Sequence, residues 1–240
     1  MKSKESLLET VVHGIFLILG LITVGCVLLI TVYLVISGVP AIAKIGLFQF
    51  LFGTKWASTA SEPSFGILPF IMTSIYGTGG AILLGVPVGF FTSVYLAKIA
   101  SPKVRGVIET AVSLLAGIPS VVYGFFGLMI IVPWVRDTFR PYYGGNGLSL
   151  FSAALLLGIM ILPTIIGVSE SAIRAVPDSY YEGSLGLGAS HERSVFFAVL
   201  PAAKSGILAG IVLGIGRAIG ETMAVVMVAG NQAIIPDGMF

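Results

Sequence analysis

Five long runs of apolar residues constrain the fold of this chain more than any other feature of its sequence. The hydrocarbon core of a bilayer is about 30 Å thick, and a helix needs about 20 apolar residues to cross it. Hydrophobic residues make up 56% of the 240 residues and charged residues only 10%, whereas a soluble domain carries about 25% charged residues. We therefore expect an all-α, polytopic bundle of membrane helices with five spans, at Val12–Ile36, Ile67–Leu96, Val107–Val135, Leu148–Ser169 and Ser205–Ala229.

Glycine and proline residues interrupt the second and third runs, which predicts kinks or partly broken helices there. The first run follows Lys2 and Lys4. It is longer than the apolar core of a signal peptide and no cleavage site closes it, so we interpret it as an uncleaved first helix.

The distribution of lysine and arginine predicts a cytoplasmic N-terminus. With that orientation the inner segments hold eight of the 13 cations, the outer loops hold four, and Arg217 lies within the last run. The inner cations are Lys2, Lys4, Lys98, Lys103, Arg105, Arg174, Arg193 and Lys204.

The sequence contains no pattern typical of an enzyme. The pair Lys204-Ser205 ends like a phosphate-binding loop, but Ala198 and Ala203 stand where its two glycines are needed. The two histidines are far apart, and one cysteine, Cys26, can form neither an internal disulfide nor a cysteine metal cluster. We expect no metal site, no cofactor in this chain and, with a net charge of only +2, no nucleic acid as partner.

The longest polar segment between two runs, 173–204, contains a motif. Glu182, two small residues, Gly188 and the pair Leu200-Pro201 have the spacing of the EAA loop, so the segment resembles that of ABC importer permeases. The resemblance implies the transmembrane domain of a type I, MetI-like ABC importer over residues 1–240, with the first helix at 12–36 and core helices over 67–229. It also implies that this loop couples to an ATPase subunit through Glu182, Gly183, Ser184, Leu185, Leu187, Gly188, Leu200 and Pro201.

Physical properties of the loop agree with docking. Leu185, Leu187, Val195, Phe196 and Val199 provide apolar side chains among charged ones, as in a helix that fits a groove of a partner. Gly186 and Gly188 allow a sharp turn between two such helices. The alternative is an amphipathic segment that rests on the inner leaflet.

Arg217 and Glu221 are two opposite charges within the last apolar run. In a helix they share a face with Gly206, Gly210 and Gly214, and such small residues let a neighbouring helix approach closely. The spacing of four residues favours an internal ion pair that orients helices. The functional alternative is that Arg217 offers its planar donors to an anion in transit while Glu221 holds the side chain between passages.

The segment Gly216–Val225, with the sequence GRAIGETMAV, resembles the signature of the PstC family of phosphate-specific permease subunits. The segment Gly117–Gly124 is similar to a stretch of the same family. The resemblance implies that Arg217 and Glu221 belong to the phosphate path. Thr222, Ser120 and Tyr123 are weaker candidates for that path.

The resemblance implies a permease subunit of an ATP-driven importer of inorganic phosphate in the bacterial inner membrane. Its expected partners are a PstA-like second permease, a cytoplasmic ATPase dimer that binds ATP and Mg²⁺, and an extracytoplasmic phosphate-binding protein. The sixth helix usual in the family has no counterpart before Phe240. Alternatives are a permease for another oxyanion, such as sulfate or molybdate, and a non-transporting membrane assembly subunit.

Overall fold

The computed structural model describes residues 2–236, and the chain divides into two compact units, Met1–Leu68 and Pro69–Phe240. Helices account for nearly all regular structure in the described residues, and the exception is one two-stranded hairpin. The expected all-α class is therefore confirmed. The interpretation of residues 1–240 as a single transmembrane domain stays a prediction.

The first unit consists of a long helix, a short helix and the hairpin. These elements are α1 (Lys2–Ile45), α2 (Leu47–Phe52), β1 (Trp56–Ala57) and β2 (Ser64–Phe65). The stretch Glu9–Ile45 of α1 has a mean hydropathy of 2.9 in its most apolar window, none of which is buried. A helix that is apolar all round is typical of a membrane span. The predicted first span lies within it.

The second unit is a helical bundle. Its elements are α3 (Leu68–Lys98), α4 (Pro102–Gly117), α5 (Ser120–Phe126), the π-helical turn η1 (Gly127–Ile131), α6 (Val132–Tyr143), α7 (Leu150–Arg174), α8 (Asp178–Gly186), α9 (His191–Ser194), the π-helical turn η2 (Val195–Val199), α10 (Leu200–Ala202), α11 (Lys204–Gly220) and α12 (Met223–Ala229).

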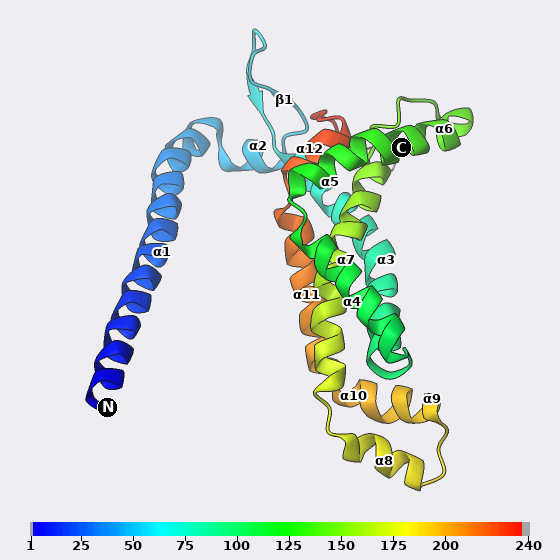
Figure 1. Ribbon diagram of the computed structural model, residues 1–240. Coiled ribbons are helices and arrows are strands. Elements are labelled where there is room, and N and C mark those ends of the chain that lie inside the picture. The colour runs from blue at the N-terminus through cyan, green and yellow to red at the C-terminus, as the bar shows by residue number, and fades with distance from the viewer. Residues whose placement is uncertain (1, 237–240) are drawn as a thin grey trace. The chain divides into compact units, whose positions relative to one another are not determined.

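The helix α7 is the centre of this bundle, with α3 and α11 beside it (Figure 1). Glycines of both neighbours make the approach close. A Cβ at Gly85 of α3 would lie 2.8 Å from the carbonyl oxygen of Gly158 in α7. Ile161 and Ile165 of α7 are fully buried in the resulting core.

The observed spans agree with the sequence in part. Four described helices are long and apolar enough to cross a membrane, and a bent pair, His191–Ala202 with Lys204–Gly220, makes up to five. The second run forms one continuous helix, α3, through Pro87. The predicted break in the third run is confirmed, because Ile118 is extended before Pro119 and separates α4 from the long segment Ser120–Tyr142. Val107–Val135 is therefore not one continuous span.

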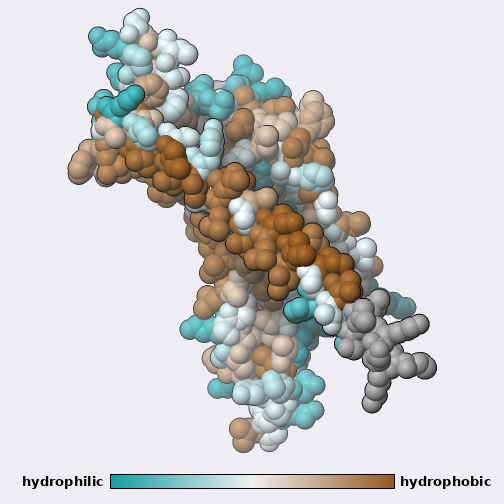
Figure 2. Space-filling view, turned by 90° about the vertical axis from the view of Figure 1, so that its left-hand side faces the viewer, coloured by the Kyte–Doolittle hydropathy of each residue, from teal (hydrophilic) through white to brown (hydrophobic). Residues whose placement is uncertain are grey.

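The predicted fifth span, Ser205–Ala229, is also not one helix. The helix α11 ends at Gly220, Glu221 has an extended backbone, and α12 begins at Met223. Much of the molecular surface nevertheless suits a lipid environment, since hydrophobic side chains cover a large part of the face shown in Figure 2. The prediction of a multi-pass membrane protein is confirmed.

Candidate functional site

Arg217 lies in the last turn of α11 and is partly buried. Its Nη1 donates a long hydrogen bond of 3.4 Å to Oγ1 of Thr164 in α7. No carboxylate of the described residues comes within 4 Å of the guanidinium group. The cation is therefore held by a neutral hydroxyl group, and most of its donors remain available.

Glu221 does not pair with Arg217 in the structure. The helix ends one residue earlier, so Glu221 takes an extended conformation (φ −80°, ψ 120°) and leaves the helical face that the sequence pattern assigns to it. Its Oε1 accepts a 3.1 Å hydrogen bond from the backbone N–H of Ala224, at the start of α12. Both the predicted ion pair and the predicted restraint of Arg217 by Glu221 are absent for this reason.

The predicted close approach at the glycine stripe is confirmed, and the neighbouring helix is α7. A Cβ added at Gly206 would clash with the Cβ of Ala172. One at Gly210 would lie 2.9 Å from Oγ of Ser169, and one at Gly214 would lie 2.7 Å from Cγ1 of Ile165. The stripe thus holds α11 in close contact with α7 over the turns that precede Arg217.

The weaker path candidates lie in different surroundings. Tyr123 is only 4% exposed, and its hydroxyl donates to the carbonyl oxygen of Leu115 across the break at Pro119. This bond braces α5 against the end of α4. Ser120 is partly exposed at the start of α5, and Thr222 is exposed between α11 and α12.

A cavity of about 50 Å³ opens beside Glu221. Its walls come from α3, the first turns of α7, and the junction of α11 with α12. The polar lining residues are Thr73, Ser74, Thr78 and Glu221, and the others are Gly77, Leu150, Ala153, Leu157, Ala218, Ile219, Val225 and Ala229.

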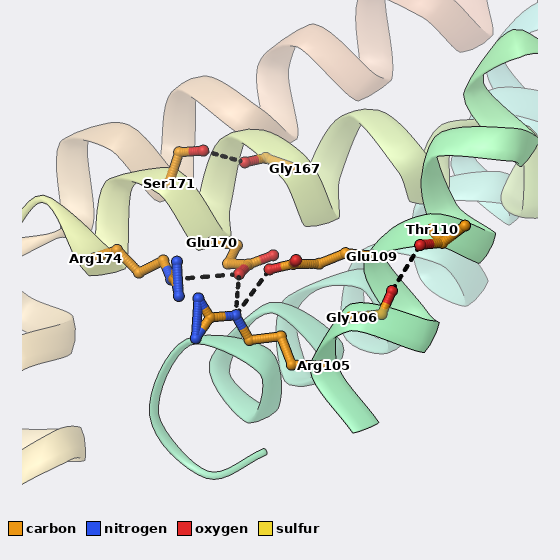
Figure 3. A network of polar contacts seen from close by, with 8 residues as sticks. All are labelled: Arg105, Gly106, Glu109, Thr110, Gly167, Glu170, Ser171 and Arg174. Atoms are coloured by element: carbon orange, nitrogen blue, oxygen red, sulfur yellow. Dashed lines mark hydrogen bonds and ion pairs between the residues drawn. The ribbon is translucent and has the colours of Figure 1, made fainter. Parts of the chain in front are cut away.

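A cluster of four charges, which sequence analysis did not single out, joins α4 to α7 (Figure 3). Nε of Arg105 lies 2.8 Å from Oε1 of Glu109 and 3.8 Å from Oε1 of Glu170. Nε of Arg174 lies 3.4 Å from the same Glu170 oxygen. Each helix shows an arginine and a glutamate four residues apart, but that signal predicts only local pairs. The contact between helices depends on tertiary packing.

The segment 173–204 folds into two helical pieces with a tight turn between them. Gly188 has φ +84°, and the N–H groups of Gly188 and Ala189 donate to the carbonyl oxygens of Leu185 and Ser184. This pattern is a Schellman motif, which ends a helix with a left-handed residue that is usually glycine. The predicted turn at Gly188 is confirmed, whereas Gly186 lies within α8.

Only some of the apolar side chains expected to dock on a partner are exposed. Leu187 is 91% exposed at the turn, and Leu185 and Phe196 are also exposed. Val195 and Val199 are buried, so their expected part in the docking surface is wrong. Together with Leu200 they pack in a core with Val94, Ile173, Val176, Ala203 and Ile207.

The other loop residues are arranged around that core. Glu182 and Gly183 are exposed on α8, Ser184 is partly exposed, and Pro201 is exposed on α10. Tyr181 ties α8 to α9, because its hydroxyl lies 2.7 Å from Nδ1 of His191. The described residues contain no group of three or more His, Cys, Asp or Glu side chains that could hold a metal ion.

Comparison with known proteins places this arrangement among transporters. A family model described as "Binding-protein-dependent transport system inner membrane component" matches residues 85–238. The probable ABC transporter permease protein YqgH of Bacillus subtilis is 36% identical over 223 residues, which are 92% of this chain and 71% of that protein. The phosphate transport system permease protein PstC of Haemophilus influenzae is 32% identical over 227 residues, which are 88% of this chain and 71% of that protein.

A shorter match and a solved structure complete the comparison. PstC of Pasteurella multocida is 34% identical over 209 residues, which are 80% of this chain and 65% of that protein, so the chain spans roughly two thirds of its length. A structure of the MetNI methionine ABC transporter in an inward-facing conformation matches with a TM-score of 0.50 at 21% identity, over 65% of this chain and 68% of that one. The likeness shows a shared fold.

Proposed function

The chain belongs to the family of binding-protein-dependent transport system inner membrane components, and we propose that it is the membrane-spanning permease subunit of an ATP-driven importer of inorganic phosphate. Relatives named as phosphate permeases are 32% and 34% identical to it over most of its length. In this proposal the chain forms half of the translocation path, and ATP is hydrolysed by a separate partner.

The surroundings of Arg217 carry the proposal. A charge within a membrane helix costs about 2.5–3.5 kcal/mol on insertion scales, and an acidic neighbour would offset much of that cost. Among the described residues Arg217 has only the hydroxyl of Thr164 as a hydrogen-bond partner. An oxyanion can therefore supply the missing negative charge through bidentate hydrogen bonds.

The long hydrogen bond between Arg217 and Thr164 is also compatible with transport. A path must bind its ion well enough to admit it and loosely enough to release it. A hydroxyl partner at 3.4 Å returns the guanidinium to one position after each passage without competing strongly for it. A carboxylate partner would have neutralised the cation and repelled the anion.

In the proposed complex the loop at 173–204 receives the movement of the ATPase. Leu187 at the turn is the most exposed side chain of that surface. Behind it, the core around Val195 and Val199 includes Val94 of α3 and Ile173 of α7. A displacement of the loop is thus transmitted to both helices, because close-packed interiors transmit strain.

The remaining parts of the complex follow the family resemblance. We propose that a PstA-like permease supplies the other half of the path and that two cytoplasmic ATPase subunits bind ATP and Mg²⁺. A soluble phosphate-binding protein delivers the anion from outside. The N-terminus lies in the cytoplasm in this arrangement.

Uptake of labelled phosphate by cells that lack their own phosphate permease tests the proposal. Cells that express this chain with its partners should take up phosphate, and Arg217→Gln should abolish uptake while leaving assembly with the ATPase intact. Arg140→Gln is the matched control, because Arg140 is exposed in the last turn of α6. Normal uptake by the Arg217→Gln variant would refute the role of the guanidinium group.

A further inference from the structure

We propose that the cavity beside Glu221 is an oxyanion site that admits only anions carrying a proton, with the hydroxyls of Thr73, Ser74 and Thr78 as donors and the Glu221 carboxylate as acceptor. This inference rests on the proposed function and adds the basis of its selectivity. Phosphate and arsenate are the ligands of this class.

The hydroxyl groups that line the cavity are uncommitted. Some hydroxyls elsewhere in the helices donate to a backbone carbonyl three or four residues earlier, those of Thr23, Thr31, Ser93, Thr110 and Ser171. Others, those of Ser169 and Ser194, are buried without a partner among the described residues. Within residues 2–236, the hydroxyls of Thr73, Ser74 and Thr78 have no such partner. Thr78 is only 8% exposed. Because Thr78 lines the cavity, its hydroxyl can donate to a ligand or water there.

Only one oxygen atom of the Glu221 carboxylate accepts a hydrogen bond from the described residues. Its Oε1 caps α12 through the N–H of Ala224. No described cation comes within 4 Å of it, and Oε2 has no partner in the part of the chain that the structure describes. Capping of α12 accounts for the position of Oε1 only. Oε2 of Glu221 remains an available acceptor in a cavity that the hydroxyls of Thr73, Ser74 and Thr78 also line.

An ionised carboxylate in an anion path repels the anion unless it can accept a hydrogen bond from it. At neutral pH phosphate and arsenate retain a proton, whereas sulfate retains none. Glu221 can therefore accept the proton of a phosphate, but it can only repel a sulfate. A site with a buried acceptor rejects a ligand that lacks the matching donor, because the acceptor is left unpaired.

The remaining negative charge of the anion lies near the positive N-terminus of α7. Leu150, the first residue of α7, lines the cavity. The N-terminus of a long helix carries about half a positive elementary charge. The helix end alone would not define a site; the hydroxyl of the largely buried Thr78 and the unpaired carboxylate oxygen of Glu221 do.

Protection of a cysteine placed in the cavity wall tests this site directly. The chain has one native cysteine, Cys26, which is exposed and can be replaced by alanine. In that background, Ile219→Cys in the assembled complex should react with a thiol reagent, because Ile219 lines the cavity and is 62% exposed. Millimolar phosphate or arsenate should slow the reaction at least threefold, and equal sulfate should not. Cys26 in the unmodified chain is the control, and its reaction should not respond to any of the three anions.

Two further variants separate the acceptor from the donors. Glu221→Gln keeps an oxygen that can cap α12 but replaces the other acceptor by an N–H donor, so protection by phosphate should fall roughly tenfold, as for the loss of one hydrogen bond to a charged group. Thr78→Val should weaken it several-fold. Thr110→Val, whose hydroxyl already donates to Gly106 in α4, should leave it unchanged.

The outcomes distinguish this site from the transport function. Suppose that the native chain takes up phosphate. If sulfate then protects the cysteine as well as phosphate does, or if phosphate protects it fully in Glu221→Gln, the proposed selectivity is overturned and the transport proposal stands. A complex that takes up no phosphate but shows selective protection would overturn the transport proposal and keep the site. Absence of protection by every anion would overturn the site itself.

Discussion

Replacing Gly214 by alanine measures how tightly α11 is packed against α7. The added Cβ would lie 2.7 Å from Cγ1 of Ile165, whereas carbon atoms in contact prefer about 3.5–4.0 Å. Ile165 cannot yield, because it is 0% exposed and its other side lies against Gly89 of α3, where a Cβ would be 2.8 Å from its Cγ2. The two helices must therefore separate locally by about 1 Å.

The energetic cost follows from that displacement. A gap of about 0.5–1 Å forfeits a quarter to a half of the dispersion attraction between the surfaces that it separates. Overpacking of a close-packed core costs about 1–3 kcal/mol. For a protein of this size each kcal/mol lowers the unfolding temperature by about 2–4 °C, so Gly214→Ala should unfold about 2–12 °C below an alanine variant of the same helix that lacks this close contact.

Thermal unfolding of the purified complex in detergent measures this change, with Gly216→Ala as the control. Gly216 belongs to the same helix, and a Cβ there meets nothing within 4 Å. Alanine stabilises the helix by about 1 kcal/mol relative to glycine in both variants. The difference between their unfolding temperatures therefore reports only the contact with Ile165. Equal unfolding temperatures for the two variants would show that α11 and α7 are not in close contact at this position.

Three further predictions concern the charge cluster and the segment 173–204. Glu170→Ala should lower the unfolding temperature of the complex more than Glu109→Ala, because it removes the largely buried carboxylate that Arg105 and Arg174 share between α4 and α7. The side chain of Glu109 is 42% exposed and its pair within α4 is worth about 0–1 kcal/mol; equal shifts would contradict this. Gly188→Ala should weaken co-purification with the ATPase, since alanine at φ +84° costs about 1–2 kcal/mol; Gly186→Ala, within α8, should not. Leu187→Asp should abolish co-purification without changing the unfolding temperature, because this side chain is 91% exposed; an unchanged ATPase yield would place the docking surface elsewhere.

Much of the architecture could be predicted from local sequence alone. The free energy of transfer into lipid depends on the composition and length of a segment, so apolar runs locate spans. The second and fourth spans were predicted within about five residues of their observed limits, and the first lies inside the longer helix α1. The turn at Gly188 was equally local, because a left-handed residue after a helix favours glycine. Helical periodicity predicted that the glycines of α11 share one face. It could not predict that the helix packed against this face is α7.

The sequence by itself determined that this chain is a helical membrane protein of a transporter family, with a charged position in its last apolar run and a helical loop between the last two runs. Only the tertiary structure decided which charges meet. The helix end at Gly220 separates Glu221 from Arg217, and the packing of α4 on α7 brings Arg105 to Glu170. The physical reason is that helical periodicity fixes a residue's direction only while the helix continues, and contacts between helices depend on how side chains far apart in the sequence fit together.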